Sequence, residues 1–158
     1  MMFHLEVQDV SEQAIPKIAW LSDCARIAYF GEREASAVLR IVDKSEAKSL
    51  NRDYREKDYA TNILSFPSDF SELPEDLLEE SDLAYLGDLV VCAEVVIEQA
   101  VEQNKSADQH WAHLVVHGML HLQGYDHVSE PEASEMEAIE IKLLGELGVP
   151  NPYNETEG

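Results

Sequence analysis

The stretch HWAHLVVHGMLHLQGYDH (110–127) decides how the rest of this chain can fold. At about 100° per residue, four of its histidines fall within an arc of about 80° on a helix: His110, His113, His117 and His121. The other directions carry mostly Ala, Trp, Leu, Val and Met. This pattern predicts a helix over residues 107–122 that is buried nearly all round and has one polar stripe.

The spacing of three histidines indicates a metal site. His117 and His121 lie one helical turn apart and can point at the same ion. Gly124 allows a sharp turn after the helix, so that His127 can return as a third ligand. Three neutral nitrogens suit one Zn²⁺ and leave a fourth position open for a water molecule, whose pKa the ion would lower. A purely structural zinc, with Asp126 or another acid as its fourth ligand, is the alternative.

The residue after His117 bears on the reaction. Zinc hydrolases with this histidine spacing carry a glutamate there as general base, whereas this chain has Gly118. Phosphodiester cleavage depends less on one carboxylate, because a metal and cations can stabilise charge on the phosphate oxygens. The glycine therefore favours a phosphodiesterase over a protease and leaves the base unassigned. We expect His110 to be a hydrogen-bonded core residue, and His113 either the same or a contact to the ligands or the substrate.

A second pattern precedes this helix. A basic stripe with the spacing i, i+4, i+8, i+11 lies on a predicted helix over 44–54: Lys44, Lys48, Arg52 and Arg55. The net charge of −21 argues against general nucleic-acid binding. However, nine of the eleven basic residues precede residue 58, and residues 69–88 hold eight acids and no base, so a local basic surface can exist. A solvated helix face with local ion pairs is the simpler alternative.

The remaining patterns place these motifs in one domain over residues 1–158. We predict strands at 3–8, 36–43, 62–67 and 85–93, the last interrupted at Gly87-Asp88, and helices at about 12–30, 44–54, 94–104, 107–122 and 130–146. The acidic residues 68–84 are expected to form a loop. This order predicts an α+β or mixed-sheet domain. We see no signal peptide and no membrane span, which predicts a cytoplasmic protein.

The sequence resembles the YbeY family of bacterial endoribonucleases and rRNA maturation factors. The resemblance rests on LNRDYREKDYATNILSFP (50–67), LGDLVVC (86–92), the histidine stretch (110–127) and EMEAIE (135–140). It departs at Ala60, where the family often has proline. The resemblance implies a zinc-dependent, single-strand-specific endoribonuclease that matures the 3′ end of small-subunit rRNA and serves ribosome quality control. It maps the zinc ligands onto His117, His121 and His127 and an important arginine onto Arg55. It also implies an α+β fold with a small mixed sheet of about four strands, surrounded by about five helices, with the zinc-binding helix at its centre.

These inferences define a mechanistic hypothesis. Arg55 and His117 serve catalysis, with Arg55 stabilising charge on the scissile phosphate, while Lys44, Lys48 and Arg52 guide single-stranded RNA. The nucleophile is either a hydroxide on the metal or the 2′-hydroxyl of the RNA. Two rivals are a metalloprotease-like hydrolase and a non-enzymatic ribosome assembly factor with a structural zinc. In either ribosomal role, the acidic body can bind the ribosome or a basic small-subunit ribosomal protein.

Overall fold

The structure is a computed structural model that describes residues 3–55, 61–67, 84–125 and 130–152. Its elements are β1 (Phe3–Asp9), α1 (Ile18–Ile27), β2 (Ala35–Val42), α2 (Lys44–Arg55), β3 (Ile63–Pro67), β4 (Ala84–Cys92), α3 (Ala93–Glu102), α4 (Ala107–Leu122) and α5 (Glu130–Glu146). Four strands and five helices within these ranges confirm the predicted α+β class.

The four strands form one mixed sheet in the order β1-β2-β4-β3. β1 pairs in parallel with β2, and β2 pairs in parallel with β4, whereas β3 is antiparallel to β4 at the edge. Because side chains alternate along a strand, Leu39 and Ile41 of β2 face the main core, and Arg40 and Val42 face the opposite side. The sheet thus has two distinct surfaces for the helices to cover.

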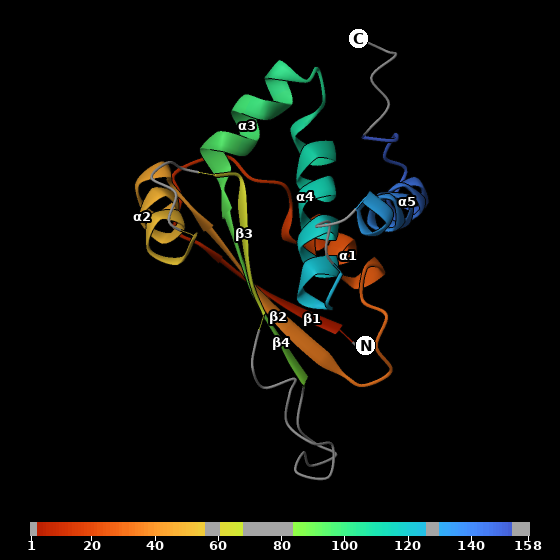
Figure 1. Cartoon of the computed structure of the whole chain (residues 1–158). Coiled ribbons are helices and arrows are strands. Elements are labelled where there is room, and N and C mark those ends of the chain that lie inside the picture. Colours follow the sequence, from red (N-terminus) through yellow and green to blue (C-terminus); the bar gives the residue numbers. More distant parts are fainter. Residues whose placement is uncertain (1–2, 56–60, 68–83, 126–129, 153–158) are drawn as a thin grey trace.

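The main core lies on one side of the sheet, where α1, α4 and α5 pack (Figure 1). α4 is its centre: ten of the sixteen residues of this helix are buried, as the apolar pattern predicted. On the opposite side, α2 places Ala47 and Leu50 against Leu64 and Val90 of the sheet in a second, smaller cluster. α4 and α2 therefore cover opposite faces of the same sheet.

β4 runs without a break through the glycine at which we expected an interruption. Ser36 of β2 pairs with Tyr85, but Val38 pairs with Asp88, so the register shifts by one residue between these two pairs. Gly87 lies at the shift and has a φ of 139°, which glycine adopts without steric cost. The interruption is thus a β-bulge inside one strand.

Two helices are shorter than predicted. α1 begins at Ile18 because Lys17, which follows Pro16, has the extended dihedrals φ −60° and ψ 142°. α3 ends at Glu102, and Asn104 has a φ of 55°, which turns the chain out of the helix. In contrast, the predicted bounds of α4 and α5 are confirmed at both ends.

None of the described helices is long and apolar enough to cross a membrane. The predicted acidic loop over 68–84 falls almost wholly on residues 68–83, which lie outside the described residues.

Candidate metal centre

α4 is fixed at both ends by local hydrogen bonds. At its start, the Ser106 hydroxyl accepts a hydrogen bond from the backbone N–H of Gln109 (3.1 Å), which is one half of a capping box. At its end, Gly124 takes a φ of 101°, and its N–H donates to the His121 carbonyl at 3.0 Å. The turn at Gly124 brings Tyr125 back beside the last turn of the helix, where its N–H donates to the Leu120 carbonyl (3.0 Å).

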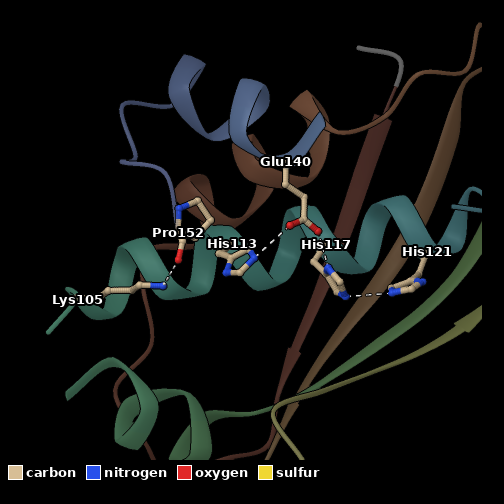
Figure 2. Close-up of polar contacts among 6 residues, drawn as sticks. All are labelled: Lys105, His113, His117, His121, Glu140 and Pro152. Atoms are coloured by element: carbon tan, nitrogen blue, oxygen red, sulfur yellow. Dashed lines mark hydrogen bonds and ion pairs between the residues drawn. The ribbon is translucent and has the colours of Figure 1, made fainter. Parts of the chain in front are cut away.

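The two histidines predicted to share a metal do face each other. The Nε2 atoms of His117 and His121 are 3.0 Å apart, and their rings meet edge to face (Figure 2). Adjacent ligands of a tetrahedral zinc with Zn–N bonds of about 2.0–2.1 Å lie about 3.3 Å apart. The pair therefore has the separation that two ligands of one ion require, after a shift of a few tenths of an ångström.

The other ring nitrogen of each histidine is held by the protein. His121 Nδ1 lies 3.0 Å from the carbonyl oxygen of Tyr125, and His117 Nδ1 lies 2.5 Å from Oε2 of Glu140. A carbonyl oxygen can only accept a hydrogen bond, so His121 Nδ1 carries a proton, and a Glu140 carboxylate would accept a proton from His117 Nδ1 in the same way. In this arrangement each ring presents the lone pair of its Nε2 atom. Two lone pairs facing each other at 3.0 Å require a cation or an additional proton between them, and this fits a metal ion.

Glu140 joins two histidines of the stripe. It comes from α5 and is 0% exposed, and its second oxygen lies 3.3 Å from His113 Nε2 (Figure 2). One ligand atom each from His113, His117 and Glu140 lie within 4.8 Å of one another, so this group could also hold a metal ion. Both Glu140 oxygens are, however, already within hydrogen-bonding distance of imidazole nitrogens, which makes Glu140 a better partner for a ligand than a ligand itself.

His110 is a hydrogen-bonded core residue, as predicted. It is 3% exposed, and its Nε2 lies 2.9 Å from Oε1 of Gln99 on α3. The same oxygen accepts a hydrogen bond from Nδ2 of Asn62, so the Nε2 of His110 is the donor. Burial, with smaller contributions from His113 and Lys105, lowers the pKa of His110 to about 4. His110 is therefore neutral at physiological pH.

Gly118 has a packing role that accounts for the absent glutamate. A Cβ atom at this position would lie 2.7 Å from Leu89 Cδ2 and 2.9 Å from Ile63 Cδ1. α4 thus approaches β3 and β4 at a distance that only glycine permits without displacing these side chains. A carboxylate at residue 118 would point into the apolar core between α4 and the sheet. The packing therefore disfavours the general base of the protease motif at this position.

The other predicted site residues lie on α2 or outside the described part of the chain. Lys44 Nζ is 2.7 Å from Glu98 Oε2, and this hydrogen bond raises the pKa of Lys44. Arg52 pairs with the neighbouring Asp53 at 3.5 Å, and Lys48 also makes a polar or charged contact. The predicted third ligand, His127, and the side chain of Arg55 fall outside the described residues. The structure thus brings together His117 and His121 and places the start of the basic stripe against acidic partners.

The motif analysis missed Glu140. A signal for it exists, because Glu140 follows Met136 by four residues and precedes Leu143 by three, on the apolar stripe of the predicted last helix. A charged residue on a buried stripe needs a buried partner. The pattern could have identified Glu140 as a buried acid, although not which histidine it contacts.

Comparison with known proteins identifies the family of this chain. A family model described as Endoribonuclease YbeY matches residues 6–148. A Pseudomonas putida KT2440 protein named Endoribonuclease YbeY is 49% identical over 158 residues, which cover 99% of this chain and 96% of the relative. A Stutzerimonas stutzeri A1501 protein of the same name is 48% identical over 155 residues, covering 98% of this chain and 93% of the relative.

One solved structure shares the fold. The solution structure of TM1509 from Thermotoga maritima aligns with a TM-score of 0.53 and 24% identity, over 96% of this chain and 98% of that chain. The family model and the relatives span nearly the whole sequence, including the histidine helix and α5. The chain therefore belongs to the YbeY family.

Proposed function

We propose that this protein is a zinc-dependent endoribonuclease that cleaves single-stranded RNA and acts in the maturation of small-subunit rRNA. One observation carries the metal dependence: the Nε2 atoms of His117 and His121 lie 3.0 Å apart, while Glu140 and the Tyr125 carbonyl hold the two Nδ1 atoms. The RNA substrate is supported by the relatives, whose names describe endoribonucleases. Binding to the ribosome or to a small-subunit ribosomal protein, in the cytoplasm, is part of the same proposal.

The chain's own residues would provide the following functions. His117 and His121 would hold the ion through their Nε2 atoms, and His127 is proposed as the third ligand. The ion would supply Lewis acidity at the scissile phosphate. Glu140 and the Tyr125 carbonyl would keep the two rings oriented, since each accepts the Nδ1 proton. Arg55 is proposed to contact the phosphate and stabilise its growing negative charge, which a guanidinium does through two parallel hydrogen bonds.

The packing of Gly118 opposes a metalloprotease. Peptide hydrolysis by this type of motif requires a carboxylate after the first histidine. Here that position is buried against Leu89 and Ile63. No other described acid replaces it beside the Nε2 atoms, because Glu140 contacts the opposite edge of the His117 ring. A phosphodiester substrate, for which charge stabilisation matters more than one base, fits the arrangement better.

The decisive experiment measures the metal content of the purified protein together with the cleavage of single-stranded RNA, with and without a chelator. We expect about one zinc per chain and loss of cleavage on chelation that added zinc reverses. Arg55→Ala should keep the metal and lose cleavage, and Arg33→Ala is a control for removal of one positive charge. Normal RNA cleavage by the metal-free protein would refute the proposal, and so would turnover of a peptide but not of RNA.

The same experiment can identify the nucleophile. Attack by the 2′-hydroxyl of the RNA leaves a 2′,3′-cyclic phosphate on the product, whereas attack by water does not. Mass spectrometry of the cleaved ends distinguishes the two routes.

A further inference from the structure

A pocket at the N-terminal end of α4 has no role in the proposed metal site. It has a volume of about 320 Å³ and lies between the α3–α4 connection and the segment that follows α5. Lys105 lines one side, and the segment after α5 contributes Val149, Asn151 and Pro152 to the other. The pocket therefore combines one cation, an amide and an apolar wall.

Lys105 differs from four other described cations of this acidic chain. Arg26, Arg40, Lys44 and Arg52 each form an ion pair with an Asp or Glu. Lys105 is partly buried, and among the described residues it contacts no carboxylate. Within this part of the chain, the hydrogen bond of its side chain joins Nζ to the carbonyl oxygen of Pro152 at 3.4 Å, which is long.

The chemistry of this pocket suits a phosphate group. An ammonium has three donors, and the hydrogen bond to Pro152 uses one of them. Gln109 also lines the pocket, and its side-chain amide can donate to a further oxygen. Burial lowers the pKa of Lys105, which is the effect expected for a cation that lacks its counter-ion. A carboxylate supplied by the protein would have neutralised the site, and in a chain with 32 acidic residues none of the described ones does so.

The pocket lies on the same helix as the metal site. Figure 2 shows the Lys105 side chain extended along α4, on the side from which His113, His117 and His121 project. Ten residues separate Ala107, the first residue of the helix, from His117, which corresponds to about 15 Å at 1.5 Å per residue. A stacked single strand of nucleic acid rises about 3.4 Å per nucleotide, so four or five nucleotides span roughly this distance.

We propose that the Lys105 pocket is a distal substrate subsite that binds a backbone phosphate of the RNA about four or five nucleotides from the scissile bond. The inference rests on the proposed endoribonuclease function and extends it, because the subsite would act on binding and not on the chemical step. Single strands fit such a pair of sites, since a flexible backbone can follow the protein surface from one to the other.

The test combines a substitution with substrate length. Lys105→Gln removes the charge and keeps a donor for the Pro152 carbonyl, and Lys105→Arg restores the charge. Lys142→Ala is the matched control, because it removes the only other cation of the second half of the chain from an exposed position on α5. Single-stranded RNAs with one mapped cleavage site are shortened stepwise from each end, and kcat and KM are measured at several salt concentrations.

We expect Lys105→Gln to raise KM several-fold on long substrates and to leave kcat unchanged. The dependence of KM on salt concentration should weaken by the amount that about one phosphate contact contributes. The effect should vanish once fewer than about four nucleotides remain on one side of the cleaved bond, and Lys105→Arg should restore KM. Equal behaviour of Lys105→Gln and Lys142→Ala on long RNA would overturn the subsite. An equal loss on substrates of every length would overturn it too. If the wild-type protein does not cleave RNA, the proposed function fails instead.

Discussion

Two helices of this protein carry a polar stripe, and the two stripes differ in how deeply the fold buries them. On α4 the stripe is made of buried or partly buried histidines, which contact Gln99 on α3 and the buried Glu140 on α5. On α2 the stripe is basic, solvent-exposed at Lys44 and Arg52, and paired there with surface acids. A buried polar group must be held by a specific partner, whereas an exposed charge is stabilised by water. The comparison predicts that substitutions of the α4 histidines have large effects and that substitutions of the ion-paired Lys44 and Arg52 on α2 have small ones.

The largest effect should follow from removing a ligand on α4. His121→Ala takes away one of the two Nε2 atoms that face each other. We expect loss of bound metal and a fall in RNA cleavage of more than about 100-fold, which is larger than the effect of removing a residue that only contacts a ligand. Metal analysis and cleavage rates of the same sample measure both. Circular dichroism must show that the variant is folded. Full activity in a folded, metal-free variant would contradict the role of this pair.

The next effect concerns Glu140, the buried partner of His117. Glu140→Gln retains one accepting oxygen where the carboxylate had two, so His113 and His117 can no longer both donate to it. Zinc affinity measured by chelator competition should fall about 10–100-fold. The ¹⁵N shifts of the imidazoles should show that one ring changes tautomer. Glu137→Gln, an exposed position on the same helix, is the control and should change neither quantity.

A third test uses pH and concerns His110, the buried histidine of the α4 stripe whose pKa is lowered by burial. His110 is neutral in the folded protein down to a pH of about 4, whereas in the unfolded chain it binds a proton below about 6.5. Acidification from pH 6.5 to 4 therefore favours unfolding. The contribution of His110 lowers the free energy of unfolding by about 3 kcal/mol at most. Urea unfolding at several pH values should show the loss, and His110→Gln should reduce the slope. An unchanged slope in this variant would assign the acid sensitivity to other groups.

The smallest effect is expected on α2. Lys44→Ala removes a cation whose charge Glu98 already compensates, so the affinity for single-stranded RNA should fall by no more than a few-fold at low salt. Fluorescence anisotropy with metal-free protein measures this affinity, and the exposed Lys17→Ala is the control. A loss of tenfold or more would show that the stripe on α2 binds RNA through Lys44 despite the ion pair.

The contrast between the two helices also explains what could be predicted. The hydrophobic pattern of 107–122 predicted α4 at both ends, and the buried environment of His110 was predicted from the same pattern. The basic spacing on α2 was equally clear, but spacing does not reveal whether an acid from elsewhere compensates a cation. Glu98, the partner of Lys44, lies 54 residues further along the chain. Such pairings depend on how the elements pack and leave no local signal.

Gly118 illustrates the same division within the metal motif. Its sequence position showed that a protease base was missing, but not why. The reason is the close approach of α4 to Leu89 and Ile63, two side chains from different strands of the sheet. The motif shows which residue occupies the position, whereas the packing around it explains which residues fit there.

The local periodicity of the chain was sufficient to establish the histidine helix, its buried environment and the one-turn spacing of His117 and His121, because these properties depend on 3.6 residues per turn and on burial of apolar side chains. The direction of the His117 ring depended on tertiary structure. Glu140, 23 residues away on α5, holds its Nδ1 atom, whereas the Tyr125 carbonyl, which follows His121 by four residues, holds the second ring locally. Hydrogen bonds between distant segments form only when the core has brought those segments together.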